Sequence, residues 1–234
     1  LGGIKVPHRI VQQVTGHNSL EVTIAEAKVN AGGVTAPAQA QPPVPGAAAA
    51  IEKVQDGVWL VTGSHNSVII EMPNELVLFE APLSEARVNE VMELANNFFF
   101  NDTATTEIYT HHHFDHSGGL RAAAAEGATI VTHELNKGFY EAAYANPRSF
   151  GPDRLSRAGG SAKFQTVGDK PVTIGDASRP IELHTLTGLG HVDGMLVGYL
   201  LKEKILIVAD AYSARAPQPA IRPPRGLRVL HCGR

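Results

Sequence analysis

Cysteine is nearly absent from this sequence, since Cys232 is the only one among 234 residues. A single thiol excludes an internal disulfide framework, and it also excludes a zinc site built from several cysteine thiolates. Any metal chemistry in the chain must therefore use histidine and carboxylate side chains. Histidine is well supplied, with 11 residues.

Long apolar runs and a surplus of positive charge are also missing. No apolar run approaches the roughly 18 residues that a membrane-spanning helix requires, and the formal net charge is −3. Lysine and arginine are scattered along the chain and form no basic stripe of the kind that binds a phosphate backbone. We therefore expect a soluble chain with a small-molecule substrate, without a membrane span and without a nucleic-acid partner.

Location and oligomeric state stay open at this level. The sequence starts at Leu1 without a methionine, as a fragment or a processed product would. A signal for export to the periplasm could therefore have been lost. The sequence holds no feature that decides the oligomeric state.

The composition predicts one sizeable domain with an appendage, because 43% of the residues are hydrophobic. Residues 1–50 are interpreted as the appendage, with one alternating strand at 20–24 and an Ala- and Pro-rich linker at 36–50. The main domain is expected at 51–215. Residues 216–234 are rich in proline and arginine and predict an irregular tail.

Strands and helices alternate in the main domain. Alternating or β-branched apolar segments bounded by turn residues predict strands at residues 58–61, 67–71, 76–79, 129–132, 181–186, 195–200 and 205–208. Periods of three and four residues predict helices after Ser84, at 120–126 and at 135–143. The pattern indicates the α/β class.

One segment fits this pattern badly. Residues 98–110 should supply the buried strand before the histidine-rich motif, yet only their last few residues have strand character. Their amino-acid sequence resembles a translated sequencing adapter, which would make the segment an artefact of sequence assembly. We assign no function to their side chains.

The central motif is His111-x-His113-x-Asp115-His116, followed by Ser117-Gly118-Gly119. His111 and His113 are two residues apart, so on an extended segment both side chains project from one face and form one half of a metal site. Asp115 and His116 follow where the chain turns, and we expect them to form a neighbouring half-site. A chance cluster with this spacing has a probability on the order of one in a thousand for this composition.

The motif resembles the signature of the metallo-β-lactamase superfamily over roughly residues 51–215. This resemblance implies an αβ/βα four-layer sandwich, here with an incomplete C-terminal end, and two metal ions at one edge of the sheets. It implies that metal one is bound by His111 and His113 together with a later histidine. That position falls on His191 in Gly190-His191-Val192-Asp193-Gly194; a simple loop histidine is the other interpretation.

The resemblance also implies the remaining ligands. Asp115 and His116 would bind metal two, and Asp210, directly after the apolar residues 205–208, would bridge both metals; a carboxylate that caps the next segment is the alternative for Asp210. His231 is the only histidine left for the family's sixth position. The segment between Asp210 and His231 looks shortened, so metal two is expected to be held more weakly than metal one.

Four further residues near these positions have open roles. His112 lies between two ligand positions and should point to the opposite face, in packing or in support of a ligand. His65 lies on a turn between early strands and either contacts substrate or is solvated. Glu80 either supports the motif loop or is a simple strand-end acid. His184 matches no ligand position and is expected to be a packing or surface residue.

These expectations combine into a zinc-dependent hydrolase. A hydroxide shared by two Zn2+ ions would attack an ester, thioester, phosphoester, sulfate-ester or lactam group. Asp115 would also orient this nucleophile. An iron-dependent oxidoreductase of the same superfamily is the alternative, and an inactive truncated remnant is the third interpretation. Asp210 resembles the bridging residue of thioesterase-, phosphodiesterase- and sulfatase-like members more than that of a β-lactamase.

Overall fold

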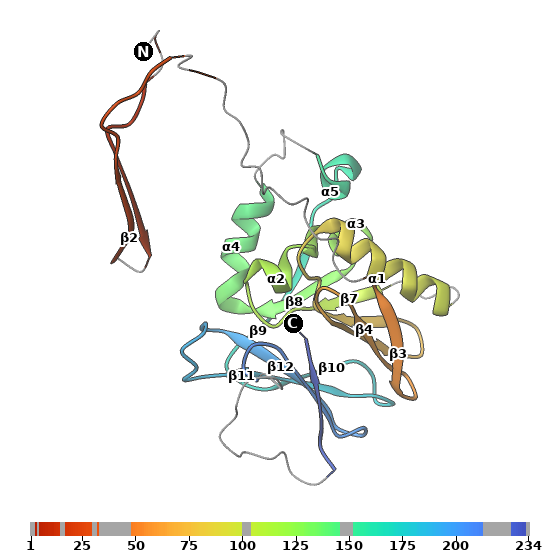
Figure 1. Cartoon of the computed structure of the whole chain (residues 1–234). Helices are drawn as coiled ribbons and strands as arrows, with labels where there is room; N and C mark the ends of the chain where they lie inside the picture. Colours follow the sequence, from red (N-terminus) through yellow and green to blue (C-terminus); the bar gives the residue numbers. More distant parts are fainter. Residues whose placement is uncertain are drawn as a thin grey trace. The chain divides into compact units, whose positions relative to one another are not determined.

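The computed structural model, shown in Figure 1, describes residues 3, 5–14, 17–29, 32, 48–99, 104–145, 152–212 and 226–232. The chain divides into two compact units, Leu1–Pro45 and Gly46–Arg234. Most of the expected linker and of the expected tail lies outside the described residues.

The first unit contains a β-hairpin. Strands β1 (Arg9–Val14) and β2 (His17–Thr23) pair in antiparallel orientation, with Ile10 opposite Val22. The strand predicted at 20–24 forms part of β2, whereas β1 was not predicted. A two-stranded hairpin is marginally stable by itself.

The second unit is built on a seven-stranded sheet. Its strands, in spatial and chain order, are β3 (Ala50–Gln55), β4 (Val58–Thr62), β5 (Ser67–Glu71), β6 (Leu76–Phe79), β7 (Ala104–Ile108), β8 (Thr129–His133) and β9 (Lys163–Val167). Strands β3 to β6 pair in antiparallel orientation, and β6 to β9 pair in parallel. The carboxyl ends of β6, β7 and β8 therefore lie at one edge of the sheet, where α/β proteins commonly bind ligands.

A second sheet of five strands completes the β structure. Its strands are β10 (Val172–Ile174), β11 (Ile181–Leu186), β12 (Met195–Leu200), β13 (Ile205–Val208) and β14 (Arg228–His231). Strand β14 pairs in parallel with β13, and His231 lies opposite Val208. The structure differs here from the prediction of an irregular tail, because β14 is too short for an alternating pattern and is defined by its pairing with β13.

The helices of the described residues all connect strands of the seven-stranded sheet. They are α1 (Glu85–Phe98), α2 (Phe114–Ser117), α3 (Leu120–Ala125), α4 (Glu134–Ala145) and α5 (Arg154–Ala158). Helix α1 begins after Ser84, whose hydroxyl accepts a hydrogen bond from the backbone N–H of Arg87, as predicted for a cap. None of these helices is long and apolar enough to span a membrane.

Two apolar cores hold the layers together. One lies between the seven-stranded sheet and the helices and includes Leu78, Val91 and Leu120. The other lies between the two sheets and includes Phe79 and Leu196. The neighbouring residues Leu78 and Phe79 supply different cores because side chains alternate across a strand. The predicted α/β sandwich is thereby confirmed.

Candidate metal centre

The motif loop starts where β7 ends. After Ile108 the chain leaves the sheet, and α2 begins directly after His113, whose carbonyl accepts the backbone N–H groups of His116 and Ser117 at 3.0 Å each. The rings of His111 and His113 have centroids 4.7 Å apart. The shared face that the spacing predicts for these two histidines is thus present.

The first group of candidate ligands contains His111, His113, His191 and Asp210, whose ligand atoms all lie within 4.8 Å of one another. The Nε2 atoms of His111 and His191 are 3.2 Å apart. Two imidazoles that share a tetrahedral zinc at about 2.0–2.1 Å have nitrogens separated by about 3.3 Å. The composition of the group and the spacing of this pair therefore fit a metal ion.

The second group contains His65, Asp115 and His116. Oδ2 of Asp115 lies 3.5 Å from Nε2 of His65 and 3.8 Å from Nε2 of His116. Nε2 of His116 is buried and makes no hydrogen bond with any residue that the structure describes. A buried nitrogen without such a partner, facing carboxylates, has the surroundings of a metal ligand.

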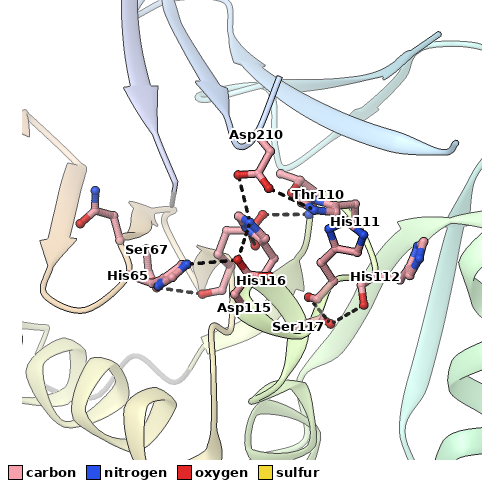
Figure 2. A network of polar contacts seen from close by, with 12 residues as sticks. His65, Ser67, Thr110, His111, His112, Asp115, His116, Ser117 and Asp210 are labelled. Atoms are coloured by element: carbon pink, nitrogen blue, oxygen red, sulfur yellow. Dashed lines mark hydrogen bonds and ion pairs between the residues drawn. The ribbon is translucent and has the colours of Figure 1, made fainter. Parts of the chain in front are cut away.

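Asp210 joins the two groups. Its Oδ2 lies 3.0 Å from Nε2 of His191, while its Oδ1 lies 3.3 Å from Nε2 of His116. Figure 2 shows the carboxylate of Asp210 above the motif loop, between His111 and His116. One oxygen faces each group, which is the arrangement of a carboxylate that bridges two ions.

Glu80 orients His116 from below the loop. It follows β6, is fully buried and has a φ of 72°, a backbone conformation that is strained for a glutamate. Its Oε1 accepts the backbone N–H of Thr110 at 2.9 Å, and its Oε2 lies 3.1 Å from Nδ1 of His116. The predicted support of the motif loop is confirmed. This contact leaves Nε2 of His116 to face the second group.

The two inner histidines have opposite electrostatic surroundings. Burial, reinforced by His116 and the other neighbouring histidines, lowers the pKa of His111 to about 2. Burial also acts to lower the pKa of His116, but the hydrogen bond and charge of Glu80 outweigh it and raise that pKa to about 9. His111 is therefore neutral and ready to bind a cation, whereas His116 must release a proton first.

Ser117 and Tyr140 fix the outer part of the loop. The Ser117 hydroxyl contacts the carbonyl oxygens of His113 at 2.9 Å and His112 at 3.2 Å, and the Tyr140 hydroxyl donates to Ser117. The His112 ring is exposed and lies against Phe139, with centroids 6.2 Å apart. Packing, one of the two roles predicted for His112, is thereby observed, while its ring also lies 5.2 Å from that of His113.

The residues predicted for the site fall into three outcomes. Those brought together in the two groups are His111, His113, Asp115, His116, His191 and Asp210. His65 is also in a group, although a substrate contact or a solvated turn was expected for it. His231 is in neither group. The roles of Tyr140 and Ser117 were not predicted, because they depend on a contact between two separate segments and on hydrogen bonds to backbone carbonyls.

Similarity to known proteins agrees with this fold. Residues 60–232 match the model of the metallo-beta-lactamase superfamily. This match spans well over half of the chain, and the chain belongs to that superfamily. No curated protein matches it.

Solved structures support the fold. A metallo-beta-lactamase from Pontibacter korlensis is 18% identical, with a TM-score of 0.58 over 79% of this chain and 91% of that chain. DIM-1 metallo-beta-lactamase is 18% identical, with a TM-score of 0.55 over 72% and 73% of the two chains. A metallo beta lactamase from Hirschia baltica is 21% identical, with a TM-score of 0.51 over 69% and 70%. At these identities the likeness concerns the fold.

Proposed function

We propose that this chain is a zinc-dependent hydrolase with a binuclear centre. His111, His113 and His191 would hold the first metal, and Asp115 and His116 would hold the second. Asp210 would bridge them, and the position of its two carboxylate oxygens between the two groups is the observation that carries the proposal. The family resemblance assigns His231 to the sixth ligand position.

The metals would supply a hydroxide at neutral pH and would polarise the bond under attack. Asp115 supplies a proton acceptor beside them. Burial alone would raise the pKa of Asp115, but His116 and His65 outweigh it and hold the pKa below its usual value. The ionised carboxylate is one-third exposed, so it can accept a hydrogen bond from a nucleophilic water and orient it.

The substrate class proposed is a small molecule with an ester, thioester, phosphoester, sulfate-ester or lactam group. The similar solved structures are named metallo-beta-lactamases, which favours including lactams in the test. A panel with one chromogenic compound of each class, assayed with the zinc-loaded chain, distinguishes these substrates.

Metal analysis tests the proposal directly. The purified full chain should bind about two zinc ions, and Asp210→Asn should weaken both sites and abolish hydrolysis. Asp193→Asn is the matched control, because Asp193 is an exposed carboxylate near His191 that belongs to neither group. Equal zinc affinity in the Asp210 and Asp193 variants would contradict the bridging role.

An iron-dependent oxidoreductase is the second candidate, because histidines with carboxylates also bind non-haem iron. Elemental analysis with an optical spectrum of the purified protein separates the two. Iron retained through purification, with oxygen consumption in place of hydrolysis, would replace the zinc proposal. An inactive remnant would show neither metal binding nor a thermal transition that rises with zinc.

A further inference from the structure

The geometry points to His65 as the third protein ligand of the second metal, completing the half-site of Asp115 and His116 without His231. This inference rests on the proposed binuclear centre. The ligand atoms of His65, Asp115 and His116 lie within 4.8 Å of one another, whereas no described group includes His231. His65, in the turn between β4 and β5, would therefore take the role of the family's sixth ligand.

Burial separates a ligand from a substrate contact. His65 is 3% exposed, and its ring stands edge-on to that of His116 with centroids 5.8 Å apart. A ring this buried reaches what binds inside the group and offers little surface to a substrate outside it. Figure 2 shows the His65 side chain directed toward Asp115 and His116.

A buried arginine holds the turn that carries His65. Nη2 of Arg87 donates to the carbonyl of His65 at 2.7 Å and to that of Thr62 at 3.1 Å. Arg87 itself is only 4% exposed. Gly63 has a φ of 152°, and a Cβ there would lie 2.8 Å from the guanidinium. A solvated turn would need neither a buried arginine nor a glycine in this conformation.

The far side of the turn is fixed as well. Ser67 donates its hydroxyl to the carbonyl of Glu80 at 2.9 Å, and Asn66 donates to the carbonyl of His231 at 3.1 Å. Glu80, which positions His116, is thus directly linked to Ser67, two residues after His65. These contacts hold His65 in place in the metal-free chain, as expected for a residue that coordinates a metal directly.

His231 lies near the same residues, but its imidazole is not part of the second group. Burial lowers the pKa of this imidazole, and Asp210, His116 and His65 also act on that pKa. His231 lies in β14, which pairs with β13, and its backbone carbonyl is engaged by Asn66. Through this contact β14 supports the turn of His65. The Asn66 contact uses the backbone carbonyl of His231 and not its imidazole, so a variant that replaces the imidazole keeps this contact.

Metal binding to the full chain tests the inference with readouts other than activity. Zinc affinity is measured by chelator competition, and the visible spectrum of the Co2+-substituted protein reports each site. His65→Ala should keep the first metal and lose affinity for the second by on the order of 100-fold or more. Loss of a residue that only orients a ligand typically costs about 10–100-fold. His231→Ala should keep both metals.

A second variant guards against misfolding. Arg87→Met removes the clamp while leaving every candidate ligand, so it should weaken the second metal by about 10–100-fold and leave the first unchanged. Circular dichroism in chelator confirms that the variants fold. Two metals retained by His65→Ala, or the second metal lost from His231→Ala, would overturn the inference. A wild-type chain that binds no metal would instead overturn the proposed function.

Discussion

Oε2 of Glu80 lies 3.1 Å from Nδ1 of His116, and the same carboxylate accepts the backbone N–H of Thr110 through its other oxygen at 2.9 Å. One buried acid thus fixes both the ring orientation of a candidate ligand and the start of the motif loop. Its strained backbone therefore lies at a residue that orients the candidate metal centre.

Glu80→Gln should weaken zinc binding at the second site by about 10–100-fold, because an amide is a poorer acceptor for the N–H of His116. Chelator competition measures the change. Glu134→Gln is the control, since Glu134 is an exposed acid at the start of α4. An unchanged zinc affinity in Glu80→Gln would show that the contact does not support the metal.

Zinc binding should release a proton from His116. The pKa of His116 in the metal-free chain is about 9, against an ordinary value of 6.5, so at pH 7.5 the ring is protonated in the folded state. Its stabilising effect on the metal-free fold is complete below pH 6.5 and is lost as the pH rises through about 9. Calorimetry of zinc binding in buffers of different ionisation enthalpy counts the released protons, and Glu80→Gln should release fewer at this pH. Equal release by both proteins would contradict the assignment.

Glu107 should destabilise the fold. It is fully buried in β7, and neither carboxylate oxygen has a hydrogen-bond partner among the described residues. Burial, with the charge of Glu80, raises its pKa well above 4.5. The folded state therefore holds a proton that the unfolded state has lost, and stability falls as the pH rises above 4.5.

Glu107→Met should raise the free energy of unfolding by about 1–3 kcal/mol and flatten this pH dependence. Thermal melts between pH 5 and 8 provide the measurement. Glu52→Met, at an exposed strand position, should change stability by less than about 0.5 kcal/mol. Lower stability in Glu107→Met than in wild type at pH 8 would show that the carboxylate is needed. Glu107 lies in the segment that resembles a translated adapter, and a poorly accommodated side chain agrees with that origin.

Gly198 should tolerate no side chain. A Cβ at this position of β12 would lie 2.4 Å from Cζ of Phe79, in the core between the two sheets. Gly198→Ala should cost about 1–3 kcal/mol, and combination with Phe79→Leu should cost less than the sum of the two changes. Gly138→Ala is the matched control, because open space surrounds Gly138 in α4. It should stabilise the chain by about 0.5–1 kcal/mol. Denaturant titration measures all four variants.

Local spacing was sufficient to predict that His111 and His113 lie together, because it requires only an extended segment. The grouping of Asp210 with them was expected from the family resemblance, which places a carboxylate at the end of a later apolar strand. The burial of His65 could not be predicted, because it depends on Arg87, which belongs to a helix formed by a separate segment. The position of His231 depends on the pairing of β14 with β13, and no sequence period specifies that register.

The edge strands β9 and β10 were missed for a related reason. β9 is mostly exposed and β10 has only three residues, so their strand conformation follows from the neighbour that they pair with. Central strands such as β5, β6 and β12 were predicted because burial on both faces leaves a continuous apolar run.

The carboxylate of Asp210 has a mechanical consequence. His111 follows the seven-stranded sheet and Asp210 follows the five-stranded one, so a metal held by both would tie the two halves of the sandwich together across a long chain loop. Such a clip is a reversible cross-link that forms only when both halves are in place, so its binding free energy adds to the stability of the folded state. Loading with metal should then slow global unfolding, and the ion would report that both halves have assembled.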